Sequence, residues 1–222
     1  MRLFLSGGGS KAFGLDKKFV EVIDKSKPML YIPIAIDAQK HPYPECLEWI
    51  RRYFSEFKFS NIEMMTNLRD VSQKSLEKFG SVYIGGGNTP YLLKELKESG
   101  FYEHLNYLIK RDIPVAGGSA GAMILAKTII PSLSADENMV GLKNFDALNK
   151  LQEYDVWCHY EPKMDKEINE YARKYALKKV IALPESCGIY VENKKMTIFG
   201  KPSAWIFSSD GKREVKTGEE FR

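Results

Sequence analysis

The sequence IPVAGGSAGA, at residues 113–122, decides the fold expected for this chain. A short apolar run ends in two glycines, Ser119 follows, and small residues lead into the apolar segment 123–127. This order predicts a strand, a sharp turn and a helix, with Ser119 at the apex of the turn. Gly117, Ser119 and Gly121 match the G-x-S-x-G pattern, in which the turn presents a serine hydroxyl as a nucleophile. Glycine-rich turns between strand and helix are also common without any catalytic role, so the motif alone leaves both interpretations open.

On both sides of this turn, short apolar runs alternate with segments of helical periodicity. Strands are predicted at 3–5, 29–36, 62–65, 81–84, 154–159 and 180–183. Helices are predicted at 15–23, 42–57, 73–79, 91–97, 101–110 and 164–177, and residues 131–152 are predicted to be loop-like. This alternation predicts an α/β fold with a doubly wound, mostly parallel sheet flanked by helices. The C-terminal tail is expected to form antiparallel hairpins, with Asp210-Gly211 as a turn signal.

Three glycine-rich loops follow three of the predicted strands. They lie at 7–9, 85–87 and 117–121. Because ligands of open α/β sheets bind beyond the carboxyl ends of the strands, these loops are expected to converge on one crevice.

Length and composition limit the classes of function. The 222 residues suit one α/β domain spanning 1–222, and the net charge of +4 is spread along the chain, so neither nucleic acid nor a membrane is expected as a partner. No apolar run reaches the length of about 20 residues that spans a bilayer, and the N-terminal apolar stretch is too short for a signal peptide. The three cysteines show no metal-ligand spacing. We therefore expect a cytoplasmic protein, monomeric or homodimeric, with reduced thiols and no metal or organic cofactor.

A serine nucleophile needs a base within hydrogen-bonding distance, and the chain has three histidines. His41 lies in a proline-flanked loop and His104 lies in the middle of a predicted helix. His159 ends a predicted strand, as Ser119 does, so both could reach the same edge of the sheet. His159 is therefore the preferred base, although a histidine at a strand end is often structural.

The base in turn needs an acidic residue that orients it. Glu185 follows the predicted strand 180–183 and would lie at the same carboxyl edge. Asp155 begins the strand that ends at His159 and should lie at the far end. Asp136 and Asp146 lie in the loop-like region after Ser119 and remain alternatives.

Two further motifs reveal a family resemblance. The sequences GGGNT at 85–89, GSAGA at 118–122 and HY at 159–160, in that order, resemble the dipeptidase E family of serine peptidases. Cyanophycinases are relatives of that family, and its fold is similar to that of class I glutamine amidotransferases, which carry cysteine at the turn. The resemblance covers most of the chain, from the N-terminus to about residue 192.

The resemblance implies roles for individual residues. It implies Ser119 as nucleophile, His159 as general base and acid, and an oxyanion hole formed by the backbone N–H groups of Gly87 and Ala120. Glu185 matches the acidic member of a cyanophycinase-like triad, whereas Asp136 lies close to the aspartate proposed for dipeptidase E. The same motifs imply substrate contacts by Asn88 and Tyr160.

One feature departs from the family pattern. Aspartyl dipeptidases of this family carry an arginine after the catalytic histidine, which holds the aspartate side chain of the substrate. Here the segment 161–168 contains no arginine, and the first one follows at Arg173. Because lysine does not replace a bidentate arginine clamp, specificity for Asp-Xaa dipeptides is not expected to carry over.

We therefore expect a serine peptidase that hydrolyses a short peptide or a related amide through an acyl-enzyme on Ser119. Two alternatives remain open. One is a non-catalytic, regulatory peptide-binding module on the same fold. The other is a dinucleotide-binding protein, because the sequence GGGSKA at 7–12 fits G-x-G-x-x-A and Asp37 follows the next strand.

Overall fold

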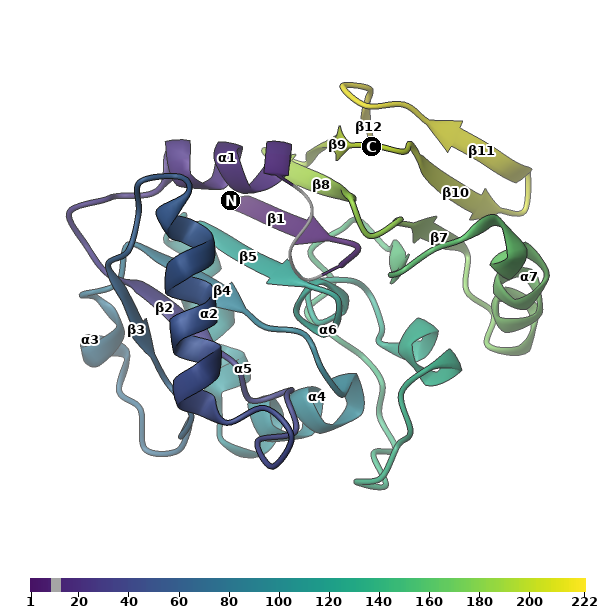
Figure 1. Cartoon of the computed structure of the whole chain (residues 1–222). Coiled ribbons are helices and arrows are strands. Elements are labelled where there is room, and N and C mark those ends of the chain that lie inside the picture. Colours follow the sequence, from purple (N-terminus) through teal and green to yellow (C-terminus); the bar gives the residue numbers. More distant parts are fainter. Residues whose placement is uncertain (9–12) are drawn as a thin grey trace.

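The computed structural model describes residues 1–8 and 13–222, and within them the strands form two β-sheets (Figure 1). The larger sheet consists of β1 (Arg2–Ser6), β2 (Met29–Ile32), β3 (Ile62–Met64), β4 (Ser81–Ile84), β5 (Val115–Gly118), β8 (Cys187–Glu192), β9 (Lys195–Gly200) and β12 (Glu220–Phe221). The smaller sheet consists of β6 (Asp155–Trp157), β7 (Lys179–Ala182), β10 (Ala204–Ser208) and β11 (Gly211–Val215). The strand orders are β12-β9-β8-β1-β5-β4-β2-β3 and β11-β10-β7-β6.

The predicted α/β class is confirmed. Strands β1, β5, β4, β2 and β3 pair in parallel, and β8, β9 and β12 extend the sheet in antiparallel fashion. The predicted hairpin at Asp210-Gly211 is also present, because β10 and β11 pair antiparallel with Ser208 opposite Gly211.

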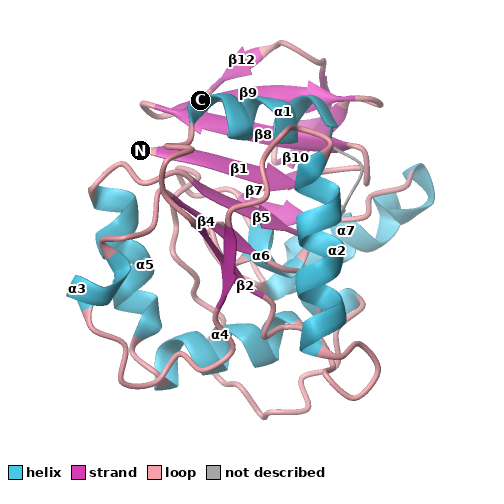
Figure 2. Cartoon of the chain, turned by 60° about the vertical axis from the view of Figure 1, so that its left-hand side comes forward, coloured by secondary structure: helices cyan, strands magenta, loops and turns pink. Residues whose placement is uncertain are grey.

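Helices cover both faces of the larger sheet (Figure 2). They are α1 (Phe13–Val22), α2 (Tyr43–Ser55), α3 (Gln73–Leu76), α4 (Thr89–Glu98), α5 (Phe101–Lys110), α6 (Ala120–Met123) and α7 (Asp165–Lys174), with 3-10 turns η1 (Ile130–Ser134) and η2 (Pro162–Met164). The described helices include none that is long and apolar enough to cross a membrane.

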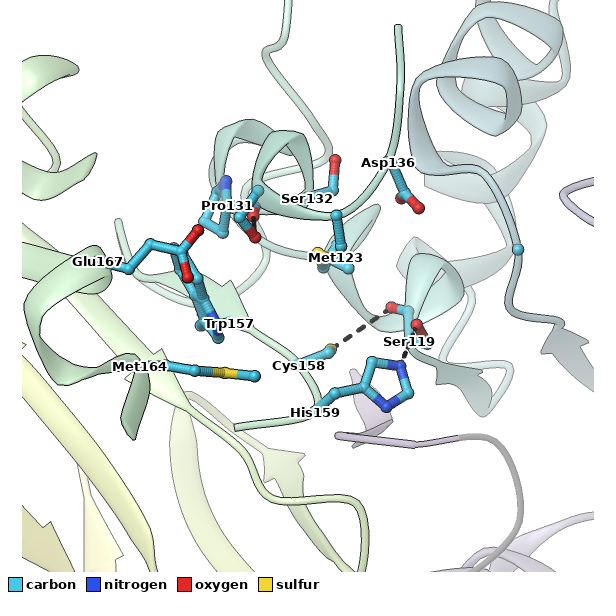
Figure 3. Close-up of a pocket in the computed structure, with 13 residues that line it drawn as sticks. Ser119, Met123, Pro131, Ser132, Asp136, Trp157, Cys158, His159, Met164 and Glu167 are labelled. Atoms are coloured by element: carbon cyan, nitrogen blue, oxygen red, sulfur yellow. Dashed lines mark hydrogen bonds between the residues drawn. The ribbon is translucent and has the colours of Figure 1, made fainter. Parts of the chain in front are cut away.

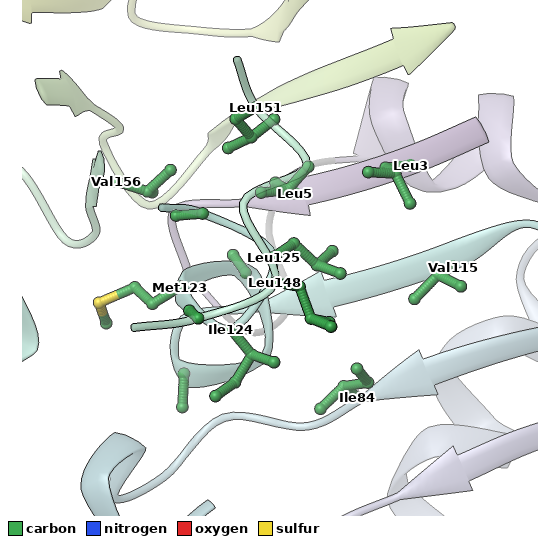
Figure 4. Close-up of a cluster of buried hydrophobic side chains, with 14 of the residues drawn as sticks. Leu3, Leu5, Ile84, Val115, Met123, Ile124, Leu125, Leu148, Leu151 and Val156 are labelled. Atoms are coloured by element: carbon green, nitrogen blue, oxygen red, sulfur yellow. The ribbon is translucent and has the colours of Figure 1, made fainter. Parts of the chain in front are cut away.

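The central strands are apolar throughout because each of their two faces meets a different helix layer. Along β1, Phe4 packs with Phe19 of α1 and Phe54 of α2, whereas Leu3 and Leu5 point to the opposite face. On that opposite face they join side chains from α6 and from the segment that follows it (Figure 4). Continuous apolar strands of this kind are typical of a parallel sheet buried on both sides.

The structure differs from the sequence-based expectation in how the strands are grouped. The expectation that Ser119 and His159 share one sheet edge is wrong, because β6 and β7 pair with each other in the smaller sheet. The position next to β1 in the larger sheet is occupied by β8 instead. The two sheets nevertheless meet at their carboxyl ends, where the His159 backbone N–H donates to the Gly7 carbonyl at 2.9 Å.

Several predicted boundaries also shift. The strand expected at 29–36 ends at Ile32, and the helix expected at 123–127 ends at Met123. After α6 the backbone turns to pair with other segments, and Lys127 N–H donates to the Tyr154 carbonyl at 2.9 Å. The region 131–152, predicted to be loop-like, begins with the 3-10 turn η1.

Candidate active site

Ser119 occupies the sharp turn that the sequence predicts. It lies directly between β5 and α6 with φ 51° and ψ −113°, a backbone conformation that costs a non-glycine residue about 1–3 kcal/mol. Its N–H donates to the Ser6 carbonyl at 3.1 Å, and its own carbonyl accepts from Ala122 at 2.9 Å. These bonds to β1 and α6 hold the turn in the strained conformation.

The glycines of the G-x-S-x-G pattern are explained by packing. A Cβ atom on Gly117 would lie 2.3 Å from the backbone of Gly121, and one on Gly121 would lie 2.2 Å from the Ile84 carbonyl oxygen. Strand β5, helix α6 and strand β4 therefore approach one another more closely than any side chain allows.

His159 is brought to Ser119 by the loop that follows β6. It lies two residues beyond the end of the strand, with φ 53°, and its Nε2 is 2.8 Å from Ser119 Oγ (Figure 3). His41 and His104 lie elsewhere. His41 faces a neighbouring hollow, and Nε2 of His104 is 2.7 Å from the Val71 carbonyl oxygen.

Glu185 completes the arrangement from the loop after β7. Its Oε1 lies 3.2 Å from Nδ1 of His159, on the side of the ring opposite Ser119. The two loops are tied together, because the Tyr160 N–H donates to the Leu183 carbonyl at 3.0 Å. Gly8 packs closely against Glu185, since a Cβ atom on Gly8 would lie 3.1 Å from the Cβ atom of Glu185. The structure thus brings Ser119, His159 and Glu185 into one hydrogen-bonded series.

Two of the other carboxylates, Asp136 and Asp155, accept hydrogen bonds from threonines, and Asp146 does not line the cavity that contains Ser119. Asp136 accepts from the backbone N–H of Thr89 at 2.9 Å and from its hydroxyl at 2.6 Å. Asp155 is buried and accepts from Thr128 in the same two ways, at 2.9 and 2.6 Å. Of these two, Asp136 lines the same cavity as Ser119, but the carboxylate bonded to His159 is Glu185.

The two residues expected to form an oxyanion hole both lie near Ser119, since Ala120 follows it in the chain and Gly87 lines the same cavity. Ala120 is the first residue of α6, so its N–H has no acceptor within the helix. The loop 85–87 lies against Ser119, because a Cβ atom on Gly86 would be 3.3 Å from that of Ser119. Gly87 has φ 136°, and a Cβ atom there would lie 2.1 Å from the Ala35 carbonyl oxygen, so only glycine fits.

Asn88 and Tyr160 have structural contacts. The Asn88 side chain accepts from the Tyr91 N–H at 2.9 Å, which caps α4, and donates to the Glu137 carbonyl at 2.9 Å. Tyr160 is buried, and its hydroxyl donates to Asp165 at 2.7 Å. Neither residue lines the cavity that contains Ser119, so their predicted contact with substrate stays a prediction.

The cavity beside Ser119 and His159 has a volume of about 440 Å³, within the range of small-molecule sites. Its walls come from β6, η1, α6 and the start of α7. Three of its residues that sequence reasoning missed are Trp157, Met164 and Glu167. The sequence signal that could have placed Glu167 on the inner face of α7 was its spacing of four residues from Tyr171, which puts both side chains on one face of the helix.

Cys158 also lines the cavity, with its Sγ 3.7 Å from the Ser119 carbonyl oxygen. Burial raises the pKa of the Cys158 thiol, so it stays protonated and is a poor nucleophile. Among residues 1–8 and 13–222, no group of three or more His, Cys, Asp or Glu side chains could hold a metal ion. The Ser119 hydroxyl, 2.8 Å from His159 Nε2, is therefore the candidate nucleophile of this cavity.

Comparison with protein families identifies the family of this chain. The model of Peptidase family S51 matches residues 3–199, which is most of the chain. The chain belongs to peptidase family S51. The resemblance to the dipeptidase E family is thereby confirmed, and the chain is a peptidase by family.

Relatives within family S51 are distant in sequence. A protein named "Probable alpha-aspartyl dipeptidase" from Drosophila melanogaster is 25% identical over 85% of this chain and 79% of its own length. A protein named "Peptidase E" from Salmonella typhimurium is 30% identical over 66% of this chain, and the match spans 63% of that protein.

Solved structures show the same fold. A putative peptidase E protein from Listeria monocytogenes superimposes with a TM-score of 0.74 at 22% identity, covering 90% of this chain and 98% of the other. A peptidase from an acI-B1 Actinobacterium gives a TM-score of 0.72 at 19% identity, covering 99% of this chain and 96% of the other. At these identities the likeness concerns the fold alone.

Proposed function

We propose that this member of family S51 is a serine peptidase that hydrolyses a short peptide, or a related amide, through an acyl-enzyme on Ser119. The observation that carries the proposal is the series Ser119 Oγ, His159 and Glu185, joined at 2.8 and 3.2 Å beside a cavity. The relatives named dipeptidase and peptidase E support a small peptide as the substrate.

The first half of the reaction forms the acyl-enzyme. Ser119 Oγ–H donates to Nε2 of His159, which takes the proton as Oγ attacks the carbonyl carbon. The carboxylate of Glu185 accepts from Nδ1–H, which fixes the tautomer and stabilises the imidazolium. The negative charge on the carbonyl oxygen is stabilised by N–H groups of Gly87 and Ala120. His159 then returns the proton to the leaving amine as the C–N bond breaks.

The second half repeats these steps with water. His159 takes a proton from a water molecule, whose oxygen attacks the ester of Ser119. When the tetrahedral intermediate collapses, Ser119 Oγ leaves and recovers a proton from His159. The balance is one water consumed and one amide bond converted into a carboxylate and an amine.

An active-site-directed fluorophosphonate tests the proposal. We expect it to phosphonylate Ser119 in the native protein, as identified by mass spectrometry of the labelled peptide, and to leave Ser119→Ala unlabelled. Hydrolysis is then followed on a library of dipeptides and short amides. An unlabelled native protein that binds peptides without cleaving them would favour the non-catalytic module instead.

A further inference from the structure

The inference below rests on the proposed function. The geometry points to a substrate with a cationic side chain on a residue adjoining the bond that Ser119 cleaves, and Glu167 and Trp157 hold that side chain. The cavity that contains Ser119 and His159 extends to the first turn of α7. Figure 3 shows Glu167, Trp157 and Met164 on one side of this cavity and Ser119 and His159 on the other.

The charge of the cavity favours a cation. Its lining residues include two carboxylates, Glu167 and Asp136, and no lysine or arginine. Asp136 already accepts two hydrogen bonds from Thr89. Within the described part of the chain, the carboxylate of Glu167 has no hydrogen-bond or ion-pair partner. Glu167 is therefore the carboxylate available to a ligand.

Three lysines on or next to the first turn of α7 form ion pairs with carboxylates other than Glu167. Lys163 lies 2.5 Å from Glu161 and Lys166 lies 3.8 Å from Glu170, its partner one turn along α7. Lys212, on β11, lies 2.6 Å from Asp165. A like-charged substrate carboxylate would meet an unpaired negative charge in this cavity, whereas an ammonium or guanidinium group would compensate it.

The apolar walls suit the stem of such a side chain. Trp157 is buried against the protein and lines the cavity, and its ring is held in place by an edge-on contact with Tyr171, whose ring centre is 5.5 Å away. A tryptophan face attracts a cation, and the flexible side chains of Met123 and Met164 can pack against methylene groups. A lysine or arginine side chain combines a cationic end group with an apolar methylene stem.

The α-ammonium group of a dipeptide is a different cation. It is attached to the carbon next to the scissile carbonyl and would remain close to Ser119. Glu167 lies across the cavity from Ser119 and His159 (Figure 3), which fits a charge carried at the end of a long side chain. Substrates that share the α-ammonium group and differ only in the side chain therefore isolate the proposed interaction.

Two pairs of dipeptides provide this comparison: Lys-Leu with norleucyl-Leu, and Leu-Lys with Leu-norleucine. Norleucine keeps the methylene stem and lacks the charge. We expect the lysine member of one pair to be cleaved with kcat/KM about 10- to 100-fold higher, a range typical of one charge-assisted contact. The pair that shows the preference identifies the side of the bond that occupies the cavity.

The variant Glu167→Gln removes the charge and keeps the shape. It is expected to bring the kcat/KM values of the lysine and norleucine substrates to within about threefold of each other. Glu170→Gln is the matched control, because Glu170 lies on the same helix, is exposed and pairs only with Lys166 in the described structure. This control should keep the preference for lysine.

The inference is overturned if the native protein cleaves norleucine substrates as well as lysine substrates, or if Glu167→Gln keeps the preference. Fluorophosphonate labelling of Ser119 separates this failure from a failure of the proposed function. If no dipeptide is cleaved, binding of lysine amide and norleucine amide to Ser119→Ala is measured by calorimetry. Tighter binding of lysine amide, lost in the double variant with Glu167→Gln, supports the site, and equal binding refutes it.

Discussion

Two hollows lie on either side of Gly87, and they differ in what they contain. The cavity proposed as the catalytic site, called the catalytic cavity below and defined by the residues around Ser119, has a volume of about 440 Å³. The neighbouring hollow, between α2 and the carboxyl ends of β2 and β4, is larger at about 780 Å³. It is lined by side chains of both charges, including Asp37, Lys40 and Arg52, and the described residues that line it include a histidine, His41, but no serine.

The proposed catalytic site therefore differs from the neighbouring hollow in the convergence of its functional groups and not in its size. Ser119 and His159 both have positive φ angles, of 51° and 53°, and both lie where the two sheets meet. Strained backbone of this kind persists only where surrounding contacts impose it. The neighbouring hollow is lined by segments of the larger sheet and its helices, and no loop of the smaller sheet is among its described lining residues.

The largest effect is expected from Ser119→Ala. Removing the nucleophile should lower kcat by about 10⁴- to 10⁶-fold, as in other serine peptidases with a triad. Steady-state hydrolysis of whichever dipeptide the native protein cleaves provides the measurement. Retention of full activity would show that the catalytic cavity is not where the bond is cut.

The next largest effect separates Glu185 and Asp136, the two carboxylates considered as the acid of the triad. Glu185→Gln should lower kcat by about 10²- to 10⁴-fold, because the His159 tautomer is no longer held. The lower end is favoured because the Glu185 and His159 side chains are 52% and 47% exposed, so water can substitute in part. Asp136→Asn, the matched control, should cost less than Glu185→Gln. The reverse order would assign the acid role to Asp136.

Gly87 lines both hollows. Its replacement tests whether its N–H group contributes to the oxyanion hole of the catalytic cavity. Gly87→Ala would place a Cβ atom 2.1 Å from the Ala35 carbonyl oxygen, so the loop must shift. Displacing one oxyanion donor typically lowers kcat by about 10²- to 10³-fold. The thermal midpoint, measured alongside, shows whether the variant remains folded. Unchanged kcat in the folded variant would remove Gly87 from the oxyanion hole.

Helix α1 carries a buried carboxyl group, Asp16, which contrasts with the half-exposed Glu185. Burial raises the pKa of Asp16 to about 6, although the Tyr53 hydroxyl, donating at 2.5 Å, opposes the rise. The folded state therefore binds more protons than the unfolded state between the two pKa values, and stability falls as the pH rises from about 4 to 6.

The variant Asp16→Asn should remove this loss. Since a shift of one pKa unit corresponds to about 1.4 kcal/mol, the variant is expected to gain roughly 2–3 kcal/mol relative to the native protein between pH 4 and pH 8. Urea unfolding at both pH values measures the difference. A constant difference across this range would show that Asp16 titrates normally.

The smallest effect is expected from Arg52→Ala in the neighbouring hollow. Because this hollow is proposed to have no part in the reaction, kcat/KM should change by less than about threefold, within the usual range for a surface substitution. The same dipeptide assay applies. A loss of tenfold or more would show that the two hollows form one substrate site, and would end the distinction between them.

Much of the fold could be predicted from the sequence because it depends on local patterns. Continuous apolar runs predicted the parallel strands, and Gly117, Ser119 and Gly121 predicted the turn, since only small residues fit where β5 crosses α6. The association of Ser119 with His159 was also predicted, but from a wrong premise, because their strands belong to different sheets.

Other features required the tertiary structure. The sequence favoured Glu185 as the acid and left Asp136 as an alternative. The structure separates them, because Asp136 accepts hydrogen bonds from Thr89 whereas Glu185 lies beside His159. Glu167 gave no sequence signal beyond its helical spacing, because a glutamate on an amphipathic helix is ordinarily solvated.

The sequence by itself determined the layered α/β fold and the strained serine turn, since each depends on residues close together in the chain. It also determined the membership of family S51, which rests on a match along residues 3–199. Only the tertiary structure decided which carboxylate meets His159 and which side chains line the cavity. Those contacts join segments from two sheets, and their formation depends on packing between the sheets rather than on any local preference.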